Sequence, residues 1–271
     1  MRPDLALTAG TPDSIADRSR RFFTGTTGRI LARIVILAAL FGAWQTLPGP
    51  GMRFWASDPV SIVAALAGWI IDGTLWRQLL ATLTVMSTSY VLGCAIGVGL
   101  GLAFGLLPRL DKILSPFIFA AYALPKIALA PLLIILFGIG IASKIVLVTV
   151  VVFFLVFSST IDGVHDTDPD LVRSLRLMGA TRSELIRKVL IPSALPWIFT
   201  SMRIAVRYAF TNTLLAELIA SNSGIGYLIA YHSGIYDAAG TYAAVLILVI
   251  LSVALTEVLT RVEKAMSRWR A

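Results

Sequence analysis

Charged side chains are scarce in this chain. Only 14% of its 271 residues are Asp, Glu, Lys or Arg, whereas 57% are hydrophobic, and the mean hydropathy is +0.84. A water-soluble domain needs more surface charge than this, so the composition excludes an ordinary soluble protein and favours an all-α protein that crosses the membrane several times. Cysteine is scarcer still. Because Cys94 is the one cysteine of the sequence, the chain cannot form an intramolecular disulfide.

The motifs of catalysis and of nucleotide binding are missing as well. The two histidines, His165 and His232, have no carboxylates or cysteines at metal-ligand spacing, and the sequence has no H-E-x-x-H and no G-x-S-x-G. A phosphate-binding loop of the form G-x-x-x-x-G-K-[ST] is also absent. We therefore expect no metal, no catalytic residue and no cofactor of the chain's own. If ATP drives this protein, a separate subunit must bind ATP and Mg²⁺.

Positive charge exceeds negative charge, with a formal net charge of +8. The basic residues cluster in the gaps between apolar runs, which is typical of the cytoplasmic loops of membrane proteins. This distribution argues against a nucleic-acid-binding surface, which would gather its basic residues on one face of a soluble domain.

Six apolar runs are long enough to cross a hydrocarbon core, which takes about 20 residues. The third run contains Pro125 and Pro131, so we expect its helix to bend. A shorter run at 58–76 begins with the helix-start pair Asp58-Pro59 and is too short to span, which predicts an interfacial or periplasmic helix. The six runs cover residues 30–47, 78–107, 113–138, 143–161, 196–220 and 241–260.

The basic residues occupy alternate gaps between these runs. By the positive-inside rule this pattern places both termini in the cytoplasm of a multi-pass inner-membrane protein. The first 28 residues are polar and predict a disordered cytoplasmic tail ahead of a membrane domain of residues 29–271. The poorly charged gaps contain Arg53, Arg77 and Lys144. The basic gaps contain Arg18, Arg20, Arg21, Arg29, Arg109, Lys112, Arg173, Arg176, Arg182, Arg187, Lys188, Arg261, Lys264, Arg268 and Arg270.

The longest polar interruption, residues 162–192, has the signals of two short helices. Each helix opens on an N-capping residue, a glycine ends the first, a capping box starts the second, and a proline ends it. A basic loop that serves topology alone does not need paired caps, so we interpret this loop as a docking surface for a cytosolic partner. The residues that give these signals are Asp168, Pro169, Gly179, Thr181, Glu184 and Pro192.

The second run carries four glycines at a spacing of four residues. This spacing places them on one helix face, where they allow another backbone to approach closely. Packing within the chain is the simpler explanation, and an interface with a second subunit is the alternative. The glycines are Gly93, Gly97, Gly101 and Gly105.

A few polar residues inside the apolar runs are candidates for lining a translocation pathway. Lys126, beside Pro125, either faces a polar pathway that attracts an anionic solute or extends to the interface. Glu217 is an intramembrane acid, and it either serves transport or forms a hydrogen bond or ion pair with a neighbouring helix. Asn212 lies five residues earlier, so it falls on a different face of the same helix.

The polar loop resembles the cytoplasmic coupling loop of the permeases of binding-protein-dependent ABC importers. Residues 179–181 (GAT) and 190–196 (LIPSALP) match the second half of that family's signature, whereas 173–175 (RSL) stands where Glu-Ala-Ala is usual. Residues 132–140 and 216–229 are similar to the branch of the family that carries sulfonates, taurine, nitrate and thiamine precursors.

This resemblance implies a type I, MetI-like permease fold with six transmembrane helices and a cytoplasmic coupling loop. It implies two permease copies in the lipid membrane, two cytoplasmic ATP-binding subunits and a periplasmic or lipid-anchored substrate-binding protein. The chain would then be a transport subunit for a small solute. It also implies that the residues coupling the chain to the ATPase are Asp168, Arg173, Arg176, Gly179, Ala180, Thr181, Glu184 and Pro192.

Two other classes of protein make different predictions. A gradient-driven secondary transporter or channel for a small anion would show inverted repeats and several intramembrane ion ligands, and this sequence shows one acid and no repeat. A membrane-embedded enzyme would need a nucleophile and a base within its bundle, and neither histidine lies in an apolar run.

Overall fold

The computed structural model describes residues 35–36, 39–46, 57–219 and 221–267, and within these ranges it contains helices and no strand. The chain groups into two units, residues 1–61 and 62–271. In the first unit, residues 35–36 and 39–46 are helical and fall within the first predicted apolar run. The rest of that run and the predicted N-terminal tail lie outside the described residues.

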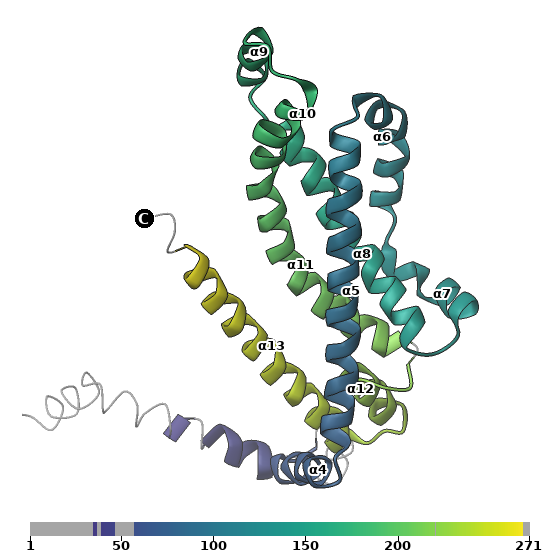
Figure 1. The fold of residues 1–271 in the computed structure, drawn as a ribbon. Coiled ribbons are helices and arrows are strands. Elements are labelled where there is room, and N and C mark those ends of the chain that lie inside the picture. Colours follow the sequence, from purple (N-terminus) through teal and green to yellow (C-terminus); the bar gives the residue numbers. More distant parts are fainter. Residues whose placement is uncertain (1–34, 37–38, 47–56, 220, 268–271) are drawn as a thin grey trace, which may run out of the picture. The chain divides into compact units, whose positions relative to one another are not determined.

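Three long helices form the centre of the second unit. Figure 1 shows α5 (Thr74–Gly105), α8 (Ile141–His165) and α11 (Ile191–Ile219) side by side, and their facing surfaces form the main apolar core. The short α4 (Pro59–Ile71) begins at the Asp58-Pro59 pair, as the sequence predicts. The remaining elements are α6 (Pro108–Ala123), η1 (Lys126–Leu129), α7 (Ala130–Phe137), α9 (Pro169–Leu177), α10 (Arg182–Leu185), η2 (Ile186–Leu190), α12 (Ile225–Gly234) and α13 (Ala238–Ser267).

Four helices of the described residues are long and apolar enough to cross a membrane. A fifth span exists if the bent pair Pro116–Ala123 and Lys126–Phe137, which meet at 83°, is counted as one. The sequence places the second to sixth apolar runs correctly on α5, on this bent pair, and on α8, α11 and α13. It misses α12, a ten-residue helix between the last two spans.

The glycine face of α5 packs against α8 in the same chain. A β-carbon placed on Gly93 would lie 2.6 Å from the Val152 side chain, and one on Gly101 would lie 2.6 Å from the Thr160 side chain. Real side chains do not approach so closely, so glycine is what allows the two backbones to pack here. Packing within the chain, the simpler of the two explanations of the motif, is therefore confirmed.

The third apolar run breaks at one proline and not at the other. Leu124 and Pro125 have extended ψ angles of 133° and 97° and separate α6 from η1. The residue before a proline avoids the helical region because of a clash with the proline ring, which explains a break at this point. Pro131 causes no kink, because it occupies the first turn of α7, where the missing N–H is not needed.

The second loop helix does not end at Pro192, and that prediction was wrong. The helix runs continuously from Arg182 to Ile219, with a π-helical segment at Ile186–Leu190 just before the proline. A π-helical turn shifts the hydrogen-bond register, so the helix continues past a residue that has no N–H to donate. The polar loop is thus joined to a membrane span without a break.

The glycine packing predicts a difference between two substitutions on the same helix. Gly101→Ala forces its methyl group against Thr160 and should destabilise the fold by about 1–3 kcal/mol. The control is Gly99→Ala, because nothing lies within 4 Å of a β-carbon at that position. We expect a lower unfolding temperature in detergent for Gly101→Ala alone. Equal unfolding temperatures for the two variants would contradict the close α5–α8 packing.

Candidate functional site

The first helix of the polar loop is capped at both ends. The Asp168 carboxylate accepts a hydrogen bond from the Asp170 N–H at 2.8 Å, and proline occupies the first turn. At the other end Gly179 has a φ of +84°, a conformation that favours glycine. Its N–H donates to the Arg176 carbonyl and the Ala180 N–H donates to the Leu175 carbonyl, both at 3.0 Å. This pattern is a Schellman motif, so the reversal after α9 has a defined geometry.

The second helix opens on the predicted capping box. The Glu184 N–H donates to the Thr181 hydroxyl at 3.3 Å, and the Thr181 N–H donates to the Glu184 carboxylate at 3.0 Å. The Lys188 ammonium pairs with the other carboxylate oxygen of Glu184 at 3.0 Å, one turn further along. Four local hydrogen bonds therefore fix the start of this helix. Two of them join a side chain to the backbone, and two join a pair of side chains.

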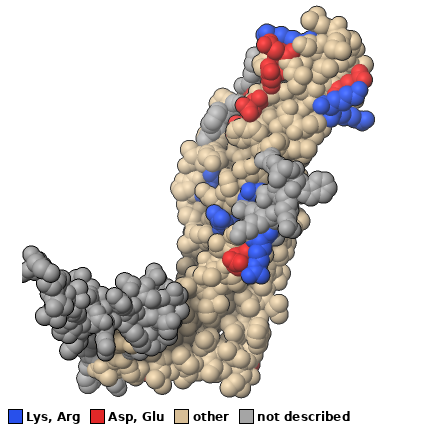
Figure 2. Space-filling model, turned by 90° about the vertical axis from the view of Figure 1, so that its left-hand side faces the viewer, with Lys and Arg blue, Asp and Glu red and all other residues tan. Residues whose placement is uncertain are grey.

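The tip of this loop exposes two large apolar residues. Leu177 is 90% exposed and Met178 is 82% exposed, although both lie in a polar segment. Figure 1 shows α9 and α10 at one end of the helical bundle, and in Figure 2 charged side chains gather at that end. Exposed apolar side chains among charged ones are typical of a surface that binds another protein.

A groove of about 640 Å³ lies between this loop and the ends of α5 and α8. Arg176 and Ala180, both singled out from the sequence, lie on its wall together with Arg182. Arg173 lies outside it and pairs with Asp170 on the exposed face of α9, at 3.2 Å. Pro192 belongs neither to the wall of the groove nor to this ion pair, because it lies within the continuous α10–α11 helix.

A buried carboxylate lies near the other end of the bundle. Glu217 on α11 is 1% exposed. The Thr82 hydroxyl of α5 lies 3.0 Å from both of its carboxylate oxygens, and the Gly226 N–H of α12 donates to it at 3.0 Å. Glu217 therefore makes the hydrogen bonds to neighbouring helices that one of its two expected roles requires, and its role in transport stays a prediction.

The same residues hold the turn that leads into α12. The Gly224 N–H donates to the Gln78 side-chain oxygen at 2.7 Å, and the Ile225 N–H donates to the Thr82 hydroxyl at 2.9 Å. Three consecutive backbone N–H groups at the start of α12 are therefore bound by side chains of α5 and α11. In a lipid environment these groups would otherwise lack partners, at a cost of several kcal/mol each.

Two glycines let the turn approach the carboxylate. Gly224 has a φ of +110°, and a β-carbon there would lie 2.1 Å from the Glu217 carboxyl carbon. A β-carbon on Gly226 would lie 2.7 Å from the Leu214 carbonyl oxygen. The sequence segment around these glycines is one that resembles the importer branch, and the close approach gives a physical reason for its composition.

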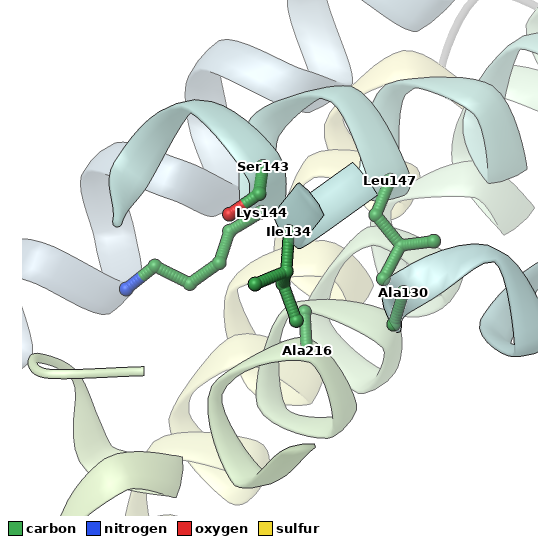
Figure 3. Close-up of a pocket in the computed structure, with 6 residues that line it drawn as sticks. All are labelled: Ala130, Ile134, Ser143, Lys144, Leu147 and Ala216. Atoms are coloured by element: carbon green, nitrogen blue, oxygen red, sulfur yellow. The ribbon is translucent and has the colours of Figure 1, made fainter. Parts of the chain in front are cut away.

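Lys144 is the residue that sequence analysis misassigned. It counts there among the basic residues of a poorly charged gap, yet its side chain is 2% exposed at the start of α8. Its ammonium donates to the Ser221 hydroxyl and the Ser223 carbonyl, each at 2.9 Å. Figure 3 shows the side chain of Lys144 extending away from apolar neighbours such as Ile134 and Leu147. The sequence signal that could have pointed to these partners of Lys144 is the serine-rich turn that follows the fifth span.

The other predicted pathway residues do not join this network. Lys126 is half-buried, and its ammonium lies 4.5 Å from the centre of the Tyr122 ring and 5.1 Å from that of Phe154. Pro125 marks the break before it. The Asn212 amide donates to the Tyr208 carbonyl of its own helix at 2.9 Å. The structure therefore brings Glu217 together with Thr82 and α12, and not with Lys126 or Asn212.

Among the described residues no group of three or more His, Cys, Asp or Glu side chains could hold a metal ion. The long apolar spans and the capped two-helix loop define the class of the chain as a multi-pass helical membrane protein. Residues 95–269 match the family of binding-protein-dependent transport system inner membrane components, and the chain belongs to this family. It is a permease subunit of an ABC importer, a transport component of the inner membrane and not an enzyme. The gradient-driven alternative is therefore set aside.

Named relatives extend this finding. The taurine transport system permease protein TauC of Escherichia coli is 32% identical over 74% of this chain and 76% of its own. The putative aliphatic sulfonates transport permease protein SsuC of Bacillus subtilis is 27% identical over 88% and 87%. The formylaminopyrimidine transport permease protein ThiX of Halalkalibacterium halodurans is 28% identical over 81% and 88%.

The fold is similar to that of a solved chain. An inward-facing structure of the MetNI methionine ABC transporter contains a chain that matches with a TM-score of 0.59 and 23% identity. The match covers 70% of this chain and 95% of that one. Membership of a binding-protein-dependent system implies partners that bind ATP and substrate.

The buried network predicts that removing the hydroxyl of Thr82 lowers the stability of the protein strongly, whereas removing the hydroxyl of Thr84 has a small effect. Thr82→Val removes a donor to Glu217 and the acceptor of the Ile225 N–H, which should destabilise the protein by about 1–3 kcal/mol for each unsatisfied group. Thr84→Val is the control, because that exposed hydroxyl bonds only to the Leu80 carbonyl of its own helix. Thermal unfolding in detergent measures both. A Thr82→Val protein as stable as Thr84→Val would show that the network does not hold the turn.

Proposed function

We propose that the loop from Asp168 to Leu190 is the site at which the ATP-binding subunit docks and from which its motion reaches the membrane. In this proposal the chain crosses the membrane six times, with the first span over residues 30–47 and both termini in the cytoplasm. A disordered tail of residues 1–28 precedes the membrane domain of residues 29–271.

The observation that carries the proposal is the unbroken helix from Arg182 to Ile219. A helix transmits a displacement along its axis, so a push on α10 moves α11 as a unit. The capping box and the Schellman motif fix α9 relative to the start of α10, which makes the loop a rigid lever. Leu177 and Met178 at its tip supply apolar side chains that a partner can bury.

The assembly proposed around this lever has two copies of the chain, two ATP-binding subunits and a substrate-binding protein outside the membrane. ATP binding closes the ATPase pair and pulls the loops together, and the spans switch between two orientations. The solute is a small molecule of the kind that the relatives carry, such as a sulfonate, taurine or a pyrimidine compound.

A single exposed side chain tests the docking surface. Leu177→Asp places a charge at the tip of the lever, where an interface would have to desolvate it, and Leu177→Met keeps the apolar contact. We expect Leu177→Asp to lose co-purification of the ATP-binding subunit with the full chain, and to lose solute-stimulated ATP hydrolysis in proteoliposomes that contain the whole assembly. Leu177→Met should retain both.

The fold provides an internal check on this experiment. Leu177 is 90% exposed, so neither substitution should change the unfolding temperature of the isolated permease. If Leu177→Asp still co-purifies with the ATP-binding subunit at the level of the unchanged chain, the loop is not the docking site.

A further inference from the structure

The groove between the polar loop and the ends of α5 and α8 carries two arginines that the chain does not neutralise. Arg176 of α9 and Arg182 of α10 are exposed on its wall. Among the described residues, no ion pair or side-chain hydrogen bond involves either guanidinium group. None of the described residues that line the groove is acidic. The groove is therefore positively charged and has no counter-ion within the described part of the chain.

The acidic residues of the two loop helices already have partners. The Asp168 carboxylate caps α9, and the Asp170 carboxylate pairs with Arg173 at 3.2 Å. The Glu184 carboxylate pairs with the Lys188 ammonium at 3.0 Å. The two unpaired guanidinium groups in the groove therefore complement an anion that comes from outside these helices.

Most of the remaining wall is apolar. His165 also lies on it, 3.7 Å from the Asp111 carboxylate. The groove measures about 640 Å³, within the range of about 300–1,000 Å³ that is usual for ligand pockets. A ligand that fits these walls has an anionic group and a hydrocarbon part. The aliphatic residues come from both sides of the groove and are Leu106, Val164, Val172, Leu185, Ile186 and Leu190.

The groove lies where two candidate membrane spans end. The apolar helices Thr74–Gly105 and Ile141–His165 both reach it with their last residues. Just beyond these ends the sequence changes from apolar to charged, at Arg109 and at Asp166. An apolar span ends where the hydrocarbon core gives way to the headgroup region. In the proposed orientation the groove therefore lies at the level of the cytoplasmic lipid headgroups.

We propose that this groove binds an anionic phospholipid of the cytoplasmic leaflet, with Arg176 and Arg182 on its phosphate and the aliphatic wall along an acyl chain. The proposal rests on the function proposed above, which sets the orientation of the chain. Guanidinium groups donate parallel N–H bonds to phosphate oxygens, and basic pockets at the cytoplasmic ends of spans suit anionic headgroups. Leu177 and Met178, the residues assigned to the ATP-binding subunit, do not line the groove, so lipid and subunit would use different surfaces of the loop.

Protection of a cysteine on the groove wall tests this site. In the full chain with Cys94→Ala, Ala180→Cys places a single thiol on the wall that carries both arginines. Met178→Cys at the exposed tip is the control position. The chain is reconstituted in nanodiscs of phosphatidylcholine with an increasing fraction of phosphatidylglycerol that has the same acyl chains. The rate of reaction with the uncharged reagent N-ethylmaleimide is measured at each fraction.

We expect phosphatidylglycerol to slow the labelling of Ala180→Cys and to leave that of Met178→Cys unchanged. Arg176→Gln or Arg182→Gln should each raise the phosphatidylglycerol fraction needed for half-maximal protection about tenfold, which is the effect of losing a charge-assisted hydrogen bond. The matched control is Arg187→Gln, because this exposed arginine of the same segment does not line the groove. It removes the same charge and should leave the protection unchanged.

Three results would overturn the proposal. The first is labelling of Ala180→Cys that phosphatidylglycerol does not slow. The second is an equal shift for Arg187→Gln, which would show a diffuse attraction of the lipid to the basic loop. The third is equal protection by soluble glycerol phosphate in phosphatidylcholine nanodiscs, which would show a site for a free phosphate anion.

The whole assembly in phosphatidylcholine alone separates this site from the docking proposal. We expect the ATP-binding subunit to protect Met178→Cys there and to leave Ala180→Cys reactive. Protection of Ala180→Cys by the subunit would show that the groove belongs to the protein partner, and the lipid proposal would be wrong. If the subunit does not bind while phosphatidylglycerol still protects Ala180→Cys in the chain alone, the docking proposal is wrong and the lipid site stands.

Discussion

The fold depends on satisfying backbone groups where helices stop inside a membrane protein. No water is available in the hydrocarbon core, so each N–H at the start of a helix needs a partner from the protein. At α12 the partners are the side chains of Gln78, Thr82 and Glu217, and the ammonium of Lys144 binds the turn just before them. This network joins α5, α8, α11 and α12, and it lets one of the spans end in a tight turn without leaving polar groups unpaired.

The network and the polar loop lie at the two ends of one helix. The helix that begins at the capping box of Thr181 ends at Ile219, two residues beyond Glu217. In the proposed function, a displacement at the loop would reach the buried carboxylate along this continuous backbone. Importers of this family need such a connection, because the energy is supplied on one side and the solute enters from the other.

Much of this architecture can be read from the sequence, for physical reasons. The apolar runs identify the spans because only helices with about 20 apolar residues cross lipid. The caps of the loop are local, so Asp168, Thr181 and Glu184 predict their own contacts. The glycine spacing of α5 predicts close packing, although not that α8 is the partner.

Contacts that join distant segments cannot be read in this way. Lys144 looks like a loop residue until its serine partners, 77 and 79 residues later, are known. Pro192 looks like a helix end, because a π-helical turn that carries the helix past it has no clear sequence signal.

The central claim is that the two-helix loop lies in the cytosol and touches the ATP-binding subunit. The most direct test is a single cysteine at Met178, 82% exposed at the tip of the loop, in the Cys94→Ala chain. The account predicts that a membrane-impermeant maleimide labels it in inverted vesicles but not in right-side-out vesicles, and that a bifunctional reagent links it to the ATP-binding subunit. Labelling from the outside, or no link in a complex that still hydrolyses ATP, would contradict the account.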